Sequence, residues 1–317
     1  MQDVLFVKTS SLGDVIHHMP ALTEAKAKLP GTRFSWVVEE AFAPLVRLHP
    51  AVAEVIPVSA RSWRRTPFQS ETRREAGDFL KRVRGCAYDA VIDTQGLMKS
   101  ALIARAARGR HHGYDSNSIK EPVACVFYGT RHAVSRDQHA IARNRALTGK
   151  VLGFAPEGAP DFGLNRQAIA GPEKERYGVL LHATARAEKE WPEANWRMLA
   201  ATLGTGIDLV VPFGTHAERE RATQIAAATR RARVPDRVAL DGVARLIAGA
   251  SFVVGVDTGL LHLAAALGVP LVAIFSATDP GLTGPMGAGR MEVLGRKGTL
   301  PSVGAVAEAV GRLDEPG

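Results

Sequence analysis

The 317-residue chain contains only two cysteines, few aromatic residues and no long hydrophobic run. Cys86 and Cys125 are too few for a disulfide framework and do not have the spacing of a metal site. No apolar stretch approaches the ~20 residues that a helix needs to cross a bilayer. The N-terminus lacks the basic start, apolar middle and cleavage site of a signal peptide. We therefore expect a cytoplasmic protein.

Several catalytic fingerprints are also missing. No G-x-G-x-x-G follows the first apolar run, as it would in most nicotinamide or flavin enzymes, and there is no Walker A loop. No G-x-S-x-G elbow is present, and no Asp-x-Asp of the kind that carries a metal in many sugar-nucleotide enzymes. Neighbouring histidines such as His17 and His18 face different directions on a helix, so they rarely share a metal. We expect neither a metal nor a cofactor.

What is present is ample apolar content and a basic charge. Hydrophobic residues make up 46% of the chain, and its length favours two domains. The net charge of +8 favours an anionic partner. Nucleic acid is a poor candidate, because aromatic residues are only 6% and no stacking platform or helix-turn-helix is evident.

Short apolar runs alternate with helical patterns along both halves of the chain, which predicts an α/β fold with parallel sheets covered on both faces. The Pro- and Gly-rich stretch 153–172 is the best candidate for a linker. Residues 112–134 are expected to be irregular. The expected strands are 4–7, 34–38, 55–58, 90–92, 179–181, 209–211, 238–240, 252–256 and 271–275. The main expected helices are 14–28, 97–107, 139–152, 192–203, 217–231, 242–248, 260–267 and 303–313.

Polar turns follow the first strand of one half and a late strand of the other. Asp257, Thr258 and Gly259 stand between a buried strand and a helix, where free backbone N–H groups and the helix dipole attract phosphate. The same residues also fit an ordinary N-cap. Asp14 stands near a helix start after the first strand, and it is either a cap or a general base.

Further candidates lie in loops beyond other strands. Thr184 and Lys189 follow the strand expected at 179–181, on the side where such sheets bind ligands, and suit phosphate. Glu218 opens a helix and either compensates the helix dipole or accepts both hydroxyls of a ribose. A dense basic group in the first half suits an anionic ligand: Arg61, Arg64 and Arg65, around Trp63.

Four ordered motifs carry a resemblance that runs nearly end to end. They are KTSSLGD at 8–14, DTQGL at 93–97, KEWP at 189–192 and DTGLLHL at 257–263. Together they resemble the lipopolysaccharide heptosyltransferases of glycosyltransferase family 9. The resemblance implies a GT-B fold, in which two Rossmann-like, doubly wound domains face a central cleft. An acceptor-binding domain of residues 1–157 plus the C-terminal helix 300–317 is expected, with a donor-binding domain of residues 172–299.

The resemblance also implies an activity. An inverting enzyme of this kind moves L-glycero-D-manno-heptose from ADP-heptose to the first Kdo of Kdo2-lipid A, at the cytosolic face of the inner membrane, without a metal. Asp14 would be the base, and Lys189 would stabilise the departing diphosphate. The implied donor-binding residues are Thr184, Ala185, Lys189, Glu218, Val238, Asp257, Thr258, Gly259 and His262. The implied acceptor-binding residues are Ser10, Ser11, Gly13, Arg61, Arg64, Arg65, Gln95, Lys120 and His139.

Two positions depart from the family pattern, which often has Arg where this chain has Lys120 and a second Thr where it has Ala185. These departures affect the detail of acceptor and donor contacts and leave the proposed base untouched. The alternatives are a related heptosyltransferase with a different core acceptor and an NAD-dependent oxidoreductase on two Rossmann-like domains.

Overall fold

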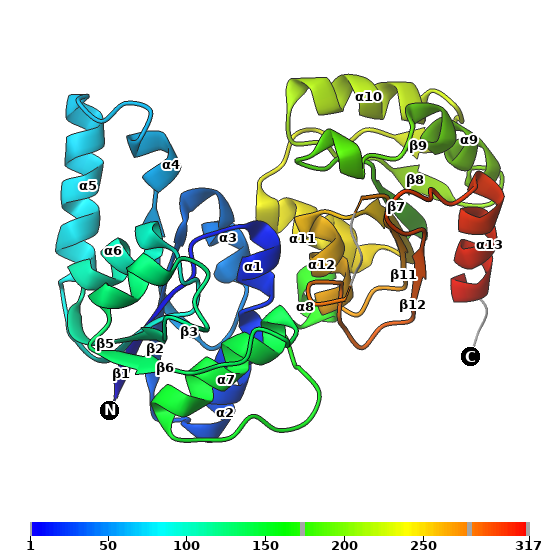
Figure 1. The fold of residues 1–317 in the computed structure, drawn as a ribbon. Helices are drawn as coiled ribbons and strands as arrows, with labels where there is room; N and C mark the ends of the chain where they lie inside the picture. The colour runs from blue at the N-terminus through cyan, green and yellow to red at the C-terminus, as the bar shows by residue number, and fades with distance from the viewer. Residues whose placement is uncertain (1, 172–174, 278–280, 315–317) are drawn as a thin grey trace. The chain divides into compact units, whose positions relative to one another are not determined.

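The computed structural model describes residues 2–171, 175–277 and 281–314. The chain divides into two compact units, Met1–Gly163 and Leu164–Gly317 (Figure 1). The division falls within the stretch 153–172 that was expected to be a linker. The predicted start of the second domain at residue 172 and the last residues of the predicted C-terminal helix, 315–317, lie outside the described residues.

The first unit contains a six-stranded parallel sheet in the order β3-β2-β1-β4-β5-β6. Because the strand order reverses between β1 and β4, the loops after these two strands border a topological switch point, the usual ligand site of such sheets. The strands are β1 (Asp3–Val7), β2 (Arg33–Glu39), β3 (Val52–Val58), β4 (Ala87–Asp93), β5 (Arg108–Tyr114) and β6 (Thr130–His132).

Helices follow most strands of the first unit. The helix expected at 14–28 is interrupted at His17 and His18, and Pro20 lies in the first turn of the second piece, where its missing N–H costs no hydrogen bond. The helices are α1 (Leu12–Ile16), α2 (Met19–Lys28), α3 (Ala43–Val46), α4 (Ala60–Trp63), α5 (Ser70–Val83), α6 (Met98–Ala106) and α7 (Ala140–Leu152), with 3₁₀ turns η1 (Glu40–Phe42) and η2 (Pro122–Phe127).

The stretch 112–134 is more regular than predicted, because part of β5 and all of β6 lie in it. The sequence of β5, RGRHHGY, is polar and begins exposed, so it lacks the apolar alternation that would have revealed it. β6 is a three-residue strand at the edge of the sheet, where only one side is paired.

The second unit repeats the topology, with a parallel sheet in the order β12-β11-β10-β7-β8-β9. Counted from its own first strand, this is the strand order of the first unit, so its switch point lies between β7 and β10. The predicted α/β class with two doubly wound sheets is confirmed. The strands are β7 (Tyr177–Leu181), β8 (Asp208–Val210), β9 (Ala232–Arg233), β10 (Phe252–Val256), β11 (Leu271–Ile274) and β12 (Met291–Leu294).

The helices of the second unit are α8 (Arg166–Ala170), α9 (Glu193–Leu203), α10 (His216–Ala226), α11 (Leu240–Gly249), α12 (Gly259–Ala266) and α13 (Val303–Asp314), with the 3₁₀ turn η3 (Ala187–Lys189). The strand predicted at 238–240 is wrong, because Leu240 begins α11 and the strand of this region is β9. No helix of the described residues is long and apolar enough to cross a membrane.

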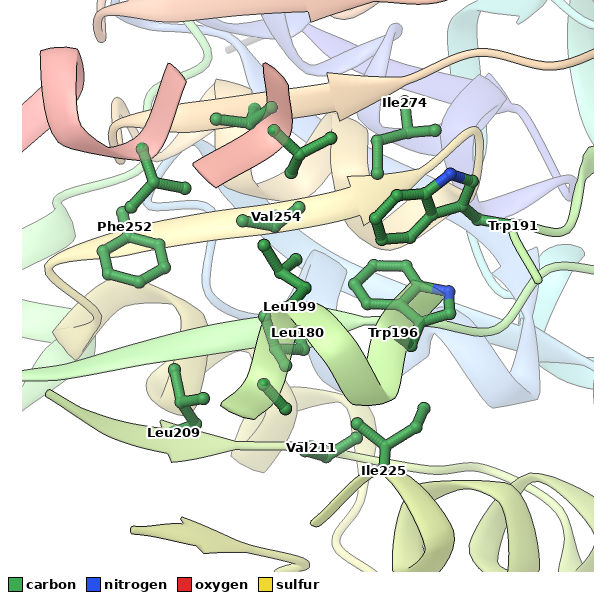
Figure 2. Packing of buried hydrophobic residues seen from close by; sticks show 14 of the residues in the cluster. Leu180, Trp191, Trp196, Leu199, Leu209, Val211, Ile225, Phe252, Val254 and Ile274 are labelled. Carbon is green, nitrogen blue, oxygen red and sulfur yellow. The ribbon is translucent and has the colours of Figure 1, made fainter. Parts of the chain in front are cut away.

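One core of the second unit is built around two indoles (Figure 2). Trp191 and Trp196 are fully buried and meet edge to face, with 5.2 Å between ring centroids. Leu199 of α9 and Phe252 and Val254 of β10 pack in the same cluster. The KEWP motif therefore supplies a core residue, Trp191, directly beside the loop that carries Lys189.

The last helix closes this same core. Val306, Ala309, Val310 and Leu313 of α13 are buried in the Trp191 cluster, and α13 contacts α9, β10, β11 and β12. The prediction that residues 300–317 join the first domain is therefore corrected for the described part of the helix. Its spacing of apolar residues predicts a helix with one buried face, but it does not specify which core receives that face.

Candidate active site

The two loops at the switch point of the first sheet are joined by one side chain. Gln95, after β4, accepts hydrogen bonds at Oε1 from the Thr9 N–H (2.7 Å) and the Thr9 hydroxyl (2.8 Å), in the turn after β1. Its Nε2 donates to the Ser10 carbonyl at 2.5 Å. Gln95 thus fixes the turn that carries Ser10 and Ser11. Its predicted contact with an acceptor stays a prediction.

A buried carboxylate supports the Gln95 loop. Asp93, at the end of β4, accepts hydrogen bonds from the Gln95 N–H (2.8 Å), the Ser100 hydroxyl (2.8 Å) and the Tyr128 hydroxyl (2.7 Å). Burial raises the pKa of Asp93, and these hydrogen bonds oppose the rise. The Gln95 N–H and the Tyr128 hydroxyl would lose this acceptor if Asp93 were replaced by an apolar residue, so the network holds the loop in place.

Asp14 completes the cap of α1. Ser11 is the N-cap residue and Asp14 is the third helical residue, one after Gly13. Oδ2 of Asp14 accepts hydrogen bonds from both the N–H and the hydroxyl of Ser11, each at 2.8 Å. Asp14 is therefore not the N-cap itself, and it stabilises the helix start from within the first turn. This capping role leaves the proposed role as a base untouched.

The charge of Asp14 is stabilised by its neighbours. Burial raises its pKa, but the Lys8 ammonium, the two Ser11 hydrogen bonds and His17 outweigh burial and hold the pKa below its usual value. Lys8 is itself buried, and its Nζ donates to the Thr94 carbonyl at 2.9 Å. Asp14 is consequently ionised at neutral pH, which is the state in which a carboxylate can accept a proton.

Lys99 connects this turn to the basic group after β3. Its Nζ donates to the Ser10 hydroxyl at 2.7 Å. Burial lowers the pKa of Lys99, Glu39 opposes the fall, and the positive charges of Arg61 and Arg64 add to it. The two arginines therefore lie within electrostatic range of the turn that leads to Asp14.

The remaining predicted acceptor residues are distributed around the unit. Lys120 is near enough to contribute to the lowered pKa of Lys8. Arg65 is exposed beyond α4. His139 is the N-cap of α7, where its Nδ1 accepts a hydrogen bond from the Ile141 N–H at 3.2 Å. A contact of any of the three with an acceptor stays a prediction.

In the second unit the switch point gathers five of the predicted donor-binding residues. Lys189 Nζ and Asp257 Oδ2 are 2.5 Å apart, and the Thr184 hydroxyl donates to the Asp257 carbonyl at 2.9 Å. Thr258 is the N-cap of α12, and Gly259 is its first residue. The first N–H groups of a helix have no partner within the helix, so they can donate to an anion. Lys189 lies beside this helix start, and the two together suit an anionic ligand.

The other predicted donor residues differ in exposure and in use. Ala185 is exposed in the loop after β7, and His262 of α12 is buried. Val238 is exposed in the loop before α11. Glu218 of α10 caps its own helix, since Oε2 accepts from the N–H groups of Gly214 (2.6 Å) and Thr215 (3.1 Å). The sequence offered compensation of the helix dipole as the alternative for Glu218, and the capping box adds hydrogen bonds to that effect. Contact with a ribose stays a prediction.

A cavity of about 410 Å³ lies beside the start of α10. It lies beyond the carboxyl ends of β8 and β9, beside the switch point between β7 and β10 and not at it. Its lining residues are Phe213, Gly214, Thr215, His216, Arg219, Asp236 and Arg237.

Several residues of the site had no role predicted from the sequence. Lys8 opens the KTSSLGD motif and Lys99 follows DTQGL by two residues, so their positions beside polar motifs were the available signal. Asp93 lay within a motif but carried no sign that its charge is buried. Tyr128 lay in a stretch that was expected to be irregular, and nothing local marked it.

Known proteins resemble this chain over nearly its whole length. Residues 77–309 match Glycosyltransferase family 9 (heptosyltransferase). Lipopolysaccharide heptosyltransferase 1 of Salmonella typhimurium is 44% identical over 313 residues, covering 96% of this chain and 98% of the relative. The structure of E. coli heptosyltransferase WaaC with ADP is 41% identical, with a TM-score of 0.93, and the match covers 98% of this chain and 100% of that one. WaaC with ADP-2-deoxy-2-fluoro heptose is 42% identical, with a TM-score of 0.88 and 98% coverage of both chains.

Proposed function

The chain belongs to glycosyltransferase family 9, the heptosyltransferases, and we propose that it moves L-glycero-D-manno-heptose from ADP-heptose to the first Kdo of Kdo2-lipid A. As a member of this family it is a glycosyltransferase, which removes the oxidoreductase alternative. Relatives at 44% identity act in lipopolysaccharide synthesis by name, and a similar protein has been solved with an ADP-heptose analogue. The observation that carries the proposed reaction is an ionised carboxylate, Asp14, at the switch point of the first sheet.

On the donor side, the diphosphate of ADP-heptose is proposed to bind at the start of α12. Lys189 would supply a full positive charge, and the N–H groups of Thr258 and Gly259 would supply hydrogen bonds. As the bond from the anomeric carbon to the diphosphate oxygen breaks, negative charge grows on ADP, so these donors bind the transition state more tightly than the substrate. Asp257 would orient Lys189 through the 2.5 Å contact that they share.

On the acceptor side, Asp14 is proposed to take the proton of the attacking Kdo hydroxyl. The hydroxyl oxygen forms its bond to the anomeric carbon from the face opposite ADP, which leaves with the electron pair, so the configuration inverts. A positioned base contributes typically 10²–10⁴-fold in rate. Arg61, Arg64 and Lys99 would bind the carboxylates and phosphates of the acceptor, because guanidinium and ammonium groups suit those oxyanions.

A calorimetric titration with ADP and UDP tests the donor assignment. We expect ADP to bind and UDP to bind more weakly. The Lys189→Ala variant should weaken ADP binding about 10- to 100-fold, the range for a hydrogen bond between charged groups. Lys297→Ala, which removes an exposed lysine of the same unit, is the matched control. Unchanged ADP affinity in Lys189→Ala would place this lysine outside the donor site.

Transfer of heptose should also survive EDTA, since no step of the proposed reaction uses a metal.

A further inference from the structure

The connection between α4 and α5 presents an aromatic ring to solvent. Phe68 is 84% exposed and is the most exposed large hydrophobic side chain among the described residues. Figure 1 shows the connection at the outer end of α5. A single exposed hydrophobic residue is ordinary on a protein surface and would carry no inference by itself. The charge around Phe68 is what distinguishes this one.

The segment 61–74 that contains Phe68 is strongly basic. Its five arginines stand against the single carboxylate of Glu71, a formal charge of +4. The one ion pair within the described segment, between Arg74 and Glu71, is 3.6 Å long with both side chains about 70% exposed, so water screens it. Basic residues around an exposed aromatic ring are the composition with which a protein binds the surface of an anionic bilayer.

The exposed ring is carried on an anchored loop. The Arg73 guanidinium donates to the Phe68 carbonyl at 3.1 Å, and the hydroxyls of Thr66 and Thr72 are 3.0 Å apart. At the base of the segment, the Trp63 indole packs on a buried ring of α5, Phe79, with 5.8 Å between centroids. The loop therefore holds Phe68 outward without having to fold first, which reduces the entropy cost of docking.

The same segment leads back to the proposed base. Arg61 and Arg64 lie within electrostatic range of Lys99, which donates to Ser10 in the turn that precedes Asp14. An acceptor sugar attached to a membrane lipid has to reach this turn while its acyl chains stay in the bilayer. A membrane contact on the 61–74 segment would bring the bilayer surface close to the acceptor-binding residues.

We propose that the segment 61–74 docks on an anionic lipid bilayer, with the Phe68 ring inserted among the headgroups and the exposed Arg65, Arg73 and Arg74 bound to lipid phosphates. The inference deepens the proposed function and rests on it, because a lipid-linked acceptor gives the docking its use. The positive charge and the exposed ring of this segment favour an anionic lipid surface as its partner, and no other protein is required.

Vesicle co-sedimentation of the full-length protein, without substrates, tests the docking. Wild type should bind vesicles of phosphatidylcholine mixed equally with phosphatidylglycerol, bind vesicles of phosphatidylcholine alone far more weakly, and lose affinity as salt is raised. Phe68→Ser should weaken binding to the mixed vesicles about tenfold, because it removes the aromatic ring from its site among the headgroups. Met198→Ser removes another exposed hydrophobic side chain, 58% exposed on α9, and should bind like wild type.

Turnover separates this inference from the proposed function. With acceptor embedded in vesicles, Phe68→Ser should lower kcat/KM about tenfold, and with acceptor freed of its acyl chains it should leave kcat/KM unchanged. Equal binding of wild type and Phe68→Ser to the mixed vesicles would overturn the docking, and so would equal binding of wild type to neutral and anionic vesicles. Transfer of heptose to the deacylated acceptor would still uphold the proposed function in either case. Failure to transfer heptose to either acceptor would overturn the proposed function instead.

Discussion

The capping role of Asp14 is compatible with its proposed role as a base, although its sequence position presented the two as alternatives. Its carboxylate caps α1 through Ser11, and the same hydrogen bonds, together with Lys8, hold its pKa low. A cap would ordinarily be a sufficient explanation for an aspartate at a helix start. Here the capping hydrogen bonds also orient the Asp14 carboxylate and favour its ionised form. The carboxylate lies at the switch point of the sheet, where a ligand would bind.

The Asp14→Asn variant tests whether Asp14 is the base, because it replaces the carboxylate by an amide of the same shape. The amide keeps the shape and a hydrogen-bond acceptor but is far too weak a base, so kcat should fall about 10²–10⁴-fold. ADP binding should persist, because the proposed donor site lies in the other unit. Steady-state kinetics and calorimetry on the same preparation measure both quantities.

Asp137→Asn is the matched control, since Asp137 is an exposed aspartate of the same unit. A thermal melt checks that Asp14→Asn is folded, because loss of the negative charge in the first turn of α1 is expected to cost about 0.3–1 kcal/mol. A folded Asp14→Asn protein with wild-type kcat would remove Asp14 from the reaction.

At the scale of elements, the turn after β1 is held from the neighbouring strand β4. The pairing of β1 with β4 brings Gln95 beside Thr9, although the two residues are 86 positions apart. Asp93 anchors the Gln95 loop from beneath. The position of α1, and with it Asp14, therefore depends on two adjacent parallel strands and on the side chains that join their ends.

Gln95→Ala separates a positioning role from the predicted acceptor contact. The variant leaves the Thr9 N–H and hydroxyl without their partner, so the free energy of unfolding should fall by about 1–3 kcal/mol and kcat should fall with it. ADP affinity should not change. Urea denaturation and steady-state kinetics measure these effects.

Gln138→Ala, an exposed glutamine of the same unit, controls for loss of an amide. A Gln95→Ala protein that keeps wild-type stability and kcat but shows a raised KM for the acceptor would mean that Gln95 binds the acceptor directly and does not position the turn.

At the scale of the whole molecule, one topology is used twice. Both units have the same strand order, and each places its polar turns at the reversal of that order. The contents of the turns differ: the first unit gathers Asp14 with several cations, and the second joins Lys189 and Asp257 to a helix N-terminus. In the proposed reaction, proton transfer and stabilisation of the leaving group therefore belong to separate folding units.

The packing of α13 predicts that a mutation in this helix destabilises the second unit and not the first. Val306 of α13 is fully buried in the core of the second unit, so Val306→Ala should lower the free energy of unfolding by about 1.5–3 kcal/mol. Hydrogen exchange should quicken in β10 and β11 and stay unchanged in β1 and β4. Glu308→Ala, at an exposed position of the same helix, should change neither. Faster exchange confined to β1 and β4 would contradict the observed packing.

The amino-acid sequence by itself determined the local features of this protein. Alternating apolar runs and helical spacings gave the α/β class and most elements, and the residues of the polar turns gave Asp14, Lys189, Thr258 and Glu218 as candidates, because caps and strand ends depend on near neighbours. Only the tertiary structure decided which core α13 closes, that Gln95 holds the Thr9 turn, and that Lys99 lies near Arg61. In a parallel sheet adjacent strands are joined by long crossovers, so the contacts between their ends are set by strand order, which no local pattern encodes.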